Sequence, residues 1–299
     1  MPYFSIVVPV YNRAGMLEQS IRTLFEQDFA DYEIILIDDG STDNVREVAM
    51  RLMAKHPNVR YYYQENSERG RARNEGIRKA SGAYVVLIDS DDFMHANHLS
   101  TLHAGIRAYD NPAFIATKFD FVSGERHYSS DIMRLKEGLY DYRLFLEGNP
   151  LACNICIRRD NPTLHLMEED RRYSTLEDWM FFLQNMKEQK LVLLDKVTIS
   201  QNDHAGRSMK SGNQALVSKA MLAYEWMRSH VEMTEKEKKQ LLAQVSYFSA
   251  IHCYLDGNRK MTTGFIRKAI AAGGFRYRYI PLFLKSLAGR KFLLKLKAH

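Results

Sequence analysis

Four short runs of β-branched and aliphatic residues alternate with polar segments in the first third of the chain. The runs cover residues 4–11, 32–38, 59–64 and 83–89. The segments between them space their apolar residues three and four positions apart, which is the period of one face of an α-helix. This β-α-β-α-β-α-β order predicts an α/β fold with a mostly parallel sheet flanked by helices.

The second part of the chain is less regular. Residues 112–122, 151–159 and 191–200 have the composition of strands, whereas residues 176–190 have the spacing of an amphipathic helix. From residue 214 onward the pattern is helical to the end. We therefore predict a sheet-containing domain over residues 1–212 and a helical C-terminal extension over residues 213–299.

The composition is that of an ordinary soluble globular protein. Of 299 residues, 45% are hydrophobic and 26% are charged, and no run of apolar residues is long enough for a membrane span. Three cysteines are too few for a disulfide framework, so a reducing, cytoplasmic location is expected. Cys153 and Cys156 have C-x-x-C spacing, but without a second pair we interpret them as packing residues rather than zinc ligands.

Charge is distributed unevenly along the chain. The net charge is +6, yet Asp256 is followed by no acidic residue and by eleven basic ones, so residues 1–256 carry −5. In residues 257–299 the basic side chains are interleaved with Phe, Tyr and Leu, a composition that suits anionic lipid headgroups. A helix that packs on the sheet-containing domain or mediates dimers is the competing interpretation.

Carboxylates follow two of the predicted strands at the point where each strand ends. Asp38 and Asp39 close the second strand, and Asp89, Asp91 and Asp92 close the fourth. Ligands of such sheets bind beyond the carboxyl ends of the strands, so these side chains are expected to meet at one edge. Their mutual repulsion requires a counter-charge, and Mg²⁺ or Mn²⁺ prefers hard oxygen ligands shared with phosphate. The sequence therefore predicts a phosphate-bearing substrate.

Common nucleotide-binding loops do not account for that substrate. There is no G-x-x-x-x-G-K-[ST] segment, and "GRARNEG" is not a dinucleotide fingerprint. Instead "VVPVYNR", "IDDGSTD", "GRARNEGIRKASGAYVVLIDSDD" and "LEDW" occur in this order. Together these motifs resemble those of family 2 glycosyltransferases with the GT-A fold, and the resemblance covers residues 1–205.

The resemblance implies a nucleoside diphosphate sugar donor, usually a UDP-sugar, bound by a nucleotide-binding half over residues 1–110. An acceptor-binding half would cover residues 111–212, with a glycan or lipid-linked glycan of a bacterial surface polysaccharide as acceptor. The donor contacts that the family motifs imply are Pro9 and Tyr11 beside the base, Asp39 on the base ring nitrogen, Arg73 near the diphosphate or base, and Asp89 facing the ribose and sugar.

The resemblance also implies roles in metal binding and proton transfer. Asp91 would ligate Mn²⁺ or Mg²⁺ directly, and His204, in a loop over residues 202–212 that closes on the donor, would add an imidazole. Asp178 would act as the general base of an inverting displacement, with Glu177 as its rival. We expect Asp92 to cap the following helix instead.

Three other classes of protein fit the sequence less well. A sugar-nucleotide nucleotidyltransferase should carry a Gly-rich basic loop after the first strand, which "VPVYNRAG" does not supply. A nucleic-acid-binding module would use the basic tail but leaves the carboxylate cluster unexplained, so nucleic acid is not expected as a partner. A phospho-receiver domain would explain an acidic pocket, but its acid pair belongs after the first strand and its chain is far shorter than this one.

The expected site of action is the cytoplasm, at the inner face of the cytoplasmic membrane where the tail makes contact.

Overall fold

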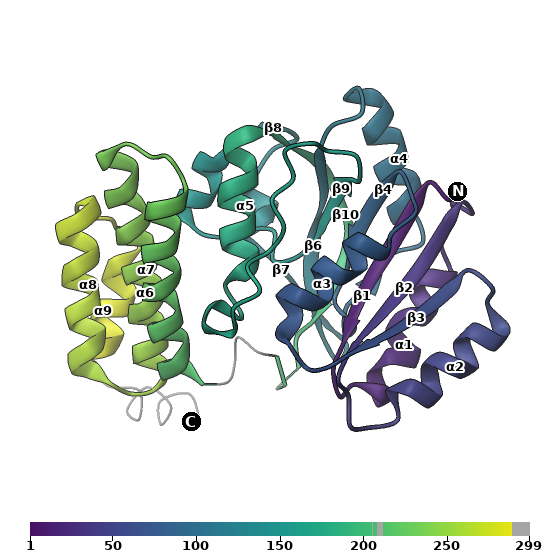
Figure 1. The fold of residues 1–299 in the computed structure, drawn as a ribbon. Helices are drawn as coiled ribbons and strands as arrows, with labels where there is room; N and C mark the ends of the chain where they lie inside the picture. Colours follow the sequence, from purple (N-terminus) through teal and green to yellow (C-terminus); the bar gives the residue numbers. More distant parts are fainter. Residues whose placement is uncertain (205, 208–211, 289–299) are drawn as a thin grey trace. The chain divides into compact units, whose positions relative to one another are not determined.

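The computed structural model describes residues 1–204, 206–207 and 212–288 and consists of two compact units (Figure 1). The sheet unit contains residues 1–142, 150–171 and 185–204, and the helical unit contains the described residues among 143–149, 172–184 and 205–299. Two short segments from the middle of the chain thus belong to the helical unit. The predicted division after residue 212 stays a prediction.

The first half of the sheet unit follows the predicted alternation of strands and helices. Strands β1 (Phe4–Val10), β2 (Tyr32–Asp39), β3 (Val59–Gln64) and β4 (Tyr84–Leu87) pair in parallel in the order β3-β2-β1-β4. Helices α1 (Ala14–Phe25), α2 (Val45–Lys55) and α3 (Glu68–Lys79) connect them. Strand β1 is buried along its whole length, which explains its almost continuous apolar sequence.

The second half of the sheet is mixed rather than parallel. It contains β5 (Phe93–Met94), β6 (Phe114–Ser123), β7 (Arg126–Ser129), β8 (Gly138–Tyr140), β9 (Ile155–Arg158) and β10 (Leu191–Asn202), with helix α4 (His98–Ala108) before β6. The sheet continues from β4 in the order β9-β6-β10-β5, while β7 pairs with β6 and β8 with β10.

Strands β6 and β10 are parallel, but β9 runs antiparallel to both β4 and β6. The α/β prediction is therefore confirmed, while the mostly parallel arrangement holds only for β1 to β4 and for the β6–β10 pair. The pattern of apolar residues could not give the direction of β9, because an irregular segment precedes it instead of a crossover helix. That segment includes the short 3₁₀ helices η1 (Asp131–Arg134) and η2 (Tyr142–Glu147), and a third, η3 (Arg171–Tyr173), follows β9.

Helix α3 lies unusually close to the sheet. A Cβ atom added to Gly76 would come within 2.1 Å of Val7 Cγ1 on β1. Gly76 thus lets the backbone of α3 approach the central strand, and Asn74, which is fully buried, fixes the helix further. Its amide exchanges two hydrogen bonds with the backbone of Met167, at 2.8 and 2.9 Å.

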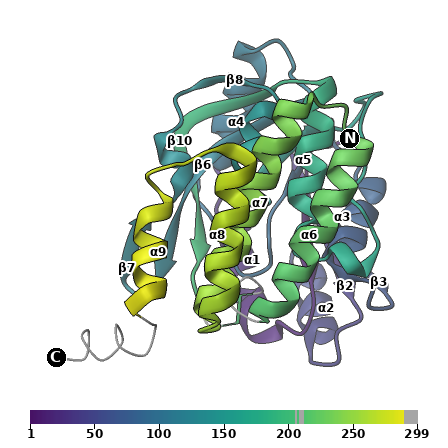
Figure 2. The ribbon, with the colours of Figure 1, turned by 90° about the vertical axis from the view of Figure 1, so that its left-hand side faces the viewer.

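The helical unit is built from α6 (Asn213–His230), α7 (Glu235–Leu255), α8 (Arg259–Gly273) and α9 (Tyr279–Ala288), and α5 (Glu177–Glu188) begins in it. Figure 2 shows α6, α7 and α8 side by side, with α9 at their edge. Tyr279 and Leu282 of α9 join a buried cluster with Ile266 of α8 and Ala250 of α7. The predicted helical C-terminal region is confirmed over residues 213–288, and residues 289–299 lie outside the described part of the chain. Within the described residues, no helix combines the length and the apolar character that crossing a membrane requires.

Candidate active site

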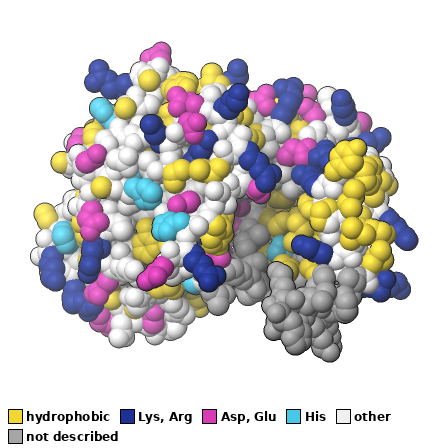
Figure 3. Space-filling view, turned by 180° about the vertical axis from the view of Figure 1, so that it is seen from behind, with side chains coloured by type: hydrophobic (Ala, Val, Ile, Leu, Met, Phe, Trp, Pro, Cys, Tyr) yellow, Lys and Arg dark blue, Asp and Glu magenta, His cyan; other side chains and the backbone are white. Residues whose placement is uncertain are grey.

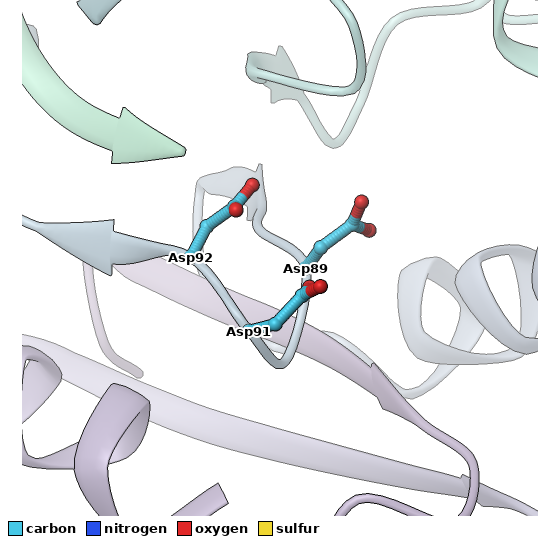
Figure 4. A group of neighbouring side chains, drawn as sticks. All are labelled: Asp89, Asp91 and Asp92. Atoms are coloured by element: carbon cyan, nitrogen blue, oxygen red, sulfur yellow. The ribbon is translucent and has the colours of Figure 1, made fainter. Parts of the chain in front are cut away.

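A tight loop between β4 and β5 carries the three carboxylates. One carboxylate oxygen each of Asp89, Asp91 and Asp92 lie within 4.8 Å of one another, and all three side chains leave the same short loop (Figure 4). The Asp92 amide donates to the Asp89 carbonyl at 3.1 Å, and the Ser20 hydroxyl of α1 donates to the Ser90 carbonyl at 2.7 Å. These bonds hold the loop at the carboxyl edge of the parallel strands, as predicted.

Asp89 is paired with a buried cation. The Arg73 Nη2 atom lies 2.7 Å from Asp89 Oδ1, and only 3% of the Arg73 side chain is exposed, against 32% for Asp89. Burial by itself raises the pKa of Asp89, but the positive charge of Arg73, followed by those of Arg69 and Arg13, outweighs it and lowers the pKa to about 2. Asp89 is therefore an ionised acceptor at neutral pH. The structure places Arg73 beneath the site rather than on the surface.

Asp91 contacts two side chains from distant parts of the chain. The His204 Nε2 atom lies 2.7 Å from Asp91 Oδ2, and Arg13, directly before α1, forms an ion pair with the same oxygen. The two residues expected to share a metal are thus neighbours. Sequence reasoning did not assign a role to Arg13, although it ends the quoted segment "VVPVYNR" and so had to lie at the carboxyl edge of β1.

Asp92 does not cap a helix, contrary to the prediction. It is followed by β5, and α4 begins only at His98. Asp92 Oδ1 instead accepts a hydrogen bond from the backbone N–H of Asn202, at the end of β10, at 3.0 Å. The pairing of β5 with β10 brings this amide close, and a sequence pattern cannot show a partner so far away along the chain.

The donor set of this loop fits a divalent cation. Carboxylate oxygens are the ligands that Mg²⁺ and Mn²⁺ prefer, and an imidazole nitrogen is acceptable to Mn²⁺. Asp91 and Asp92 are each less than a tenth exposed, so their charges are held in surroundings that favour a bound counter-charge. In this structure Arg13 supplies part of that charge to Asp91.

Asp39 and its neighbours form the other side of the carboxyl edge. Asp39 is the last residue of β2, and its Oδ1 accepts hydrogen bonds from Gln64 Nε2 at 2.6 Å and from the Ser67 amide at 2.9 Å. Pro9 is buried in β1, and Tyr11, which follows that strand, is 47% exposed. Gln64 was not predicted to matter. Its place opposite Asp39 in the β2–β3 register explains the contact.

Asp178 lies in the helical unit, in the first turn of α5, as predicted for a helix N-terminus. Its Oδ1 accepts a hydrogen bond from the Trp179 amide at 2.7 Å. Glu177 is only 1% exposed, which disfavours this rival as a base that must reach an acceptor. Trp179 is a packing residue, because it is buried and its indole N–H donates to the Phe145 carbonyl at 2.7 Å.

Two further predictions concern the surroundings of the loop. The segment over residues 202–212 is described only in part, since residues 205 and 208–211 lie outside the described residues. The cysteines of the C-x-x-C segment are both buried, and burial raises the pKa of the Cys156 thiol, as expected for packing residues. Cys153 and Asn154 line a small hollow next to Asp89 and Asp92.

Fold and site together define an α/β protein that presents hard oxygen ligands beyond the carboxyl ends of parallel strands, where such folds bind their ligands. The family model for glycosyl transferase family 2 matches residues 5–160, more than half of the chain. The chain therefore belongs to glycosyl transferase family 2, and the resemblance inferred from the motifs is confirmed.

Curated relatives agree with this assignment. The chain is 30% identical over 216 residues to a glycosyltransferase of Haemophilus influenzae, covering 72% of this chain and 84% of that protein. It is 34% identical over 125 residues to Glycosyltransferase GlyG of Streptococcus pneumoniae, over 42% of each chain. It is 38% identical over 104 residues to a Campylobacter jejuni GalNAc(5)-diNAcBac-PP-undecaprenol beta-1,3-glucosyltransferase, over 34% of each chain. The last two matches thus span less than half of those relatives.

Solved structures show the same fold. S. aureus TarS 1-349 in complex with UDP-GlcNAc superposes with a TM-score of 0.61 at 17% identity, covering 92% of this chain and 93% of that one. The mannosyltransferase PcManGT from Pyrobaculum calidifontis in complex with GDP-Man and Mn²⁺ gives a TM-score of 0.58 at 18% identity, covering 96% and 80%. The fold is thus of the GT-A type, with a helical C-terminal region.

Proposed function

We propose that this glycosyltransferase moves a sugar from a UDP-sugar to a hydroxyl group of a glycan or lipid-linked glycan in the synthesis of a cell-surface polysaccharide. The observation that carries the proposal is the cluster of Asp89, Asp91 and Asp92, whose carboxylates lie within 4.8 Å at the edge that Asp39 also reaches. The TarS complex with UDP-GlcNAc supports a UDP-linked donor. The Campylobacter relative, named for an undecaprenol-linked substrate, supports a lipid-linked acceptor.

The donor nucleotide is proposed to lie across the carboxyl edge of β1 and β2. Asp39 Oδ1 is engaged by Gln64 and Ser67, so Oδ2 is the oxygen we assign to the base ring N–H. Tyr11 and Pro9 border the base. Asp89, kept ionised by Arg73, accepts hydrogen bonds from ribose and sugar hydroxyls.

Mn²⁺ or Mg²⁺ is proposed to be held by Asp91 and His204, where it stabilises the charge of the departing diphosphate. Asp91 is paired with Arg13 and His204 in the present structure. A cation bound at this oxygen would displace Arg13, and its guanidinium would then donate to phosphate oxygens at the same edge. Asp89 and Asp92 keep the surrounding loop negative and thereby favour the cation.

Asp178 is proposed to take the proton from the acceptor hydroxyl. As Asp178 takes the proton, the acceptor oxygen attacks the anomeric carbon on the face opposite the leaving group. The bond from that carbon to the diphosphate oxygen breaks, and the configuration is inverted. Asp178 lies in the first turn of α5 and accepts a hydrogen bond from the backbone N–H of Trp179. Both features favour the carboxylate form that a base requires.

The enzyme is proposed to work in the cytoplasm, at the inner face of the membrane, where its basic C-terminal region contacts anionic lipid. That prediction covers residues 257–299, of which residues 289–299 lie outside the described part of the chain.

A thermal-shift titration tests the donor and metal assignments together. The purified protein is titrated with UDP, GDP and dTDP, each with Mn²⁺, Mg²⁺ or EDTA, beside Asp91→Ala and a control in the exposed Asp131, Asp131→Ala. UDP with metal at 100 times its dissociation constant should stabilise the protein by about 2.7 kcal/mol. The control should keep this shift and Asp91→Ala should lose it. Equal shifts with EDTA would contradict the metal site, and a preference for GDP would reassign the donor.

A further inference from the structure

Helix α9 presents a row of large apolar side chains to solvent. Ile280 and Phe283 are each 39% exposed, Leu284 is 56% exposed and Leu287 is 43% exposed. Their spacing of three, one and three residues places them on one side of a helix with 3.6 residues per turn. We call these four residues the α9 stripe. Tyr279, Leu282 and Ser286 are buried instead, so α9 is anchored by residues outside the stripe.

Other exposed apolar residues lie directly before α9. Phe275 and Tyr277, in the connection from α8, are more than half exposed. Figure 3 shows hydrophobic side chains gathered over the C-terminal helices, with Lys and Arg side chains around them. Apolar side chains that gather in one exposed patch, rimmed by polar ones, are typical of a surface that binds a partner or a membrane.

The charges around the α9 stripe identify the kind of partner. Between residues 257 and 288 there is no acidic residue, and the basic ones are Arg259, Lys260, Arg267, Lys268, Arg276, Arg278 and Lys285. Glu147 neutralises part of this charge by pairing with Arg276 and Arg278. The remaining cations favour an anionic surface, and their mixture with aromatic and aliphatic side chains matches the headgroup region of a bilayer.

The one apolar side of α9 decides how it meets such a surface. Among the described residues, no helix has the length and apolar character that crossing a bilayer requires. A helix with one apolar side can lie in the plane of the interface with that side among the acyl chains.

We infer that the α9 stripe docks the protein on an anionic membrane surface. This inference deepens the proposed function and rests on it for its purpose, because docking brings the enzyme to an acceptor carried on lipid. The stripe enters the boundary between headgroups and acyl chains, and the basic character of residues 257–288 attracts the anionic headgroups. Each Lys or Arg close to the surface adds about fivefold to the affinity.

Vesicle binding tests the inference on the full chain. Sedimentation with vesicles of equimolar phosphatidylglycerol and phosphatidylcholine is compared with pure phosphatidylcholine. The test variant is Leu284→Glu/Leu287→Glu, and its matched control is Leu139→Glu/Leu222→Glu, because Leu139 and Leu222 are 56% and 42% exposed on other elements. Wild type and control should bind anionic vesicles, and the test variant should bind at least about tenfold more weakly. Raising the ionic strength, which leaves the stripe unchanged, should weaken the binding of wild type to the anionic vesicles.

Equal binding by the test variant, or no binding by wild type, would overturn the inference. A wild-type dimer that the test variant dissociates, together with no vesicle binding, would also overturn it and assign the stripe to a second copy of the chain. The same preparations are assayed for stabilisation by UDP with metal. If UDP stabilises the protein but vesicles do not bind it, only the docking inference fails. If vesicles bind the protein but UDP does not stabilise it, the proposed donor site fails and the docking inference stands.

Discussion

Arg73 lies under the carboxylate of Asp89, with its Nη2 atom 2.7 Å from Asp89 Oδ1 and almost no surface of its own in contact with solvent. Because α3 carries Arg73 and the loop after β4 carries Asp89, the pair also joins a helix to the candidate active site. A buried cation beneath a partly exposed carboxylate fixes both the position and the ionisation of that carboxylate.

Replacing Arg73 tests this relationship. In Arg73→Met the burial of Asp89 is no longer opposed by its nearest cation, so the pKa of Asp89 should rise and the protein should lose about 1.5–3 kcal/mol of stability. The pKa of Asp89 is about 2 in the folded protein and 3.8 in the unfolded chain. Its carboxylate therefore stabilises the fold fully above pH 3.8, and this stabilisation is lost as the pH falls toward 2. Urea unfolding of Arg73→Met, Asp89→Asn and the double variant measures the coupling, and strictly additive losses would contradict it.

Arg13 competes with a cation for Asp91. Its guanidinium is paired with Asp91 Oδ2, so removing it in Arg13→Met should strengthen Mn²⁺ binding without nucleotide by about fivefold, the equivalent of about 1 kcal/mol. Mn²⁺ titration followed by electron paramagnetic resonance measures this change. Removal of Arg51, an exposed residue paired with Glu18, serves as the control. Weaker Mn²⁺ binding in Arg13→Met would show that the arginine supports the site instead.

Asp178 is expected to affect turnover and not donor binding. Asp178→Asn keeps the shape of the side chain but cannot accept a proton, so kcat should fall by about 10²–10⁴. The stabilisation by UDP with metal should remain as in wild type. Glu177→Gln at a buried neighbour provides the comparison, and a larger loss of kcat there would transfer the role to Glu177.

Gly76 is expected to tolerate no side chain. In Gly76→Ala the new Cβ would overlap Val7 Cγ1, which should destabilise the protein by about 1–3 kcal/mol or more as α3 moves from the sheet. Gly264 is the matched control, because it also lies in a helix and a Cβ there would meet nothing within 4 Å. Gly264→Ala should raise stability by about 0.5–1 kcal/mol. Equal effects of both changes on the urea midpoint would refute this explanation.

His98 makes stability depend on pH. It is buried in α4, its Nδ1 lies 2.7 Å from Thr198 Oγ1, and burial lowers its pKa from 6.5 to about 3. The unfolded chain therefore binds a proton below pH 6.5 that the folded chain does not. Stability should be full above this pH and fall by up to about 1.4 kcal/mol per pH unit below it. Urea midpoints of wild type and His98→Gln between neutral and mildly acidic pH measure the difference, and parallel profiles would exclude His98 as the cause.

Local pattern was sufficient to predict the first half of the sheet unit. Strands β1, β2 and β4 are buried along nearly their whole length, so their apolar runs are almost continuous, and the edge strand β3 is recognisable from its β-branched and aromatic residues. The parallel order then required Asp39 and the Asp89–Asp92 loop to share one edge. This is why the carboxylate cluster was predictable before its geometry was known.

Contacts between distant segments were not predictable in the same way. Asp92 was assigned to a helix cap because its actual partner, the backbone N–H of Asn202, lies in β10 and is not visible in the local sequence. The ion pair of Arg13 with Asp91 and the antiparallel direction of β9 likewise depend on how the strands assemble. The family motifs supplied His204, whose contact with Asp91 no periodicity indicates.

The strand pairing that brings β10 to β5 also has a consequence for the order of folding. Asp91 and His204 are separated by 113 positions and Asp92 and Asn202 by 110, so both contacts form only after a very long loop has closed. The carboxylate loop is therefore expected to reach its final form late, after β1 to β4 have paired. A ligand that binds only the finished loop should slow unfolding while leaving the rate of folding almost unchanged.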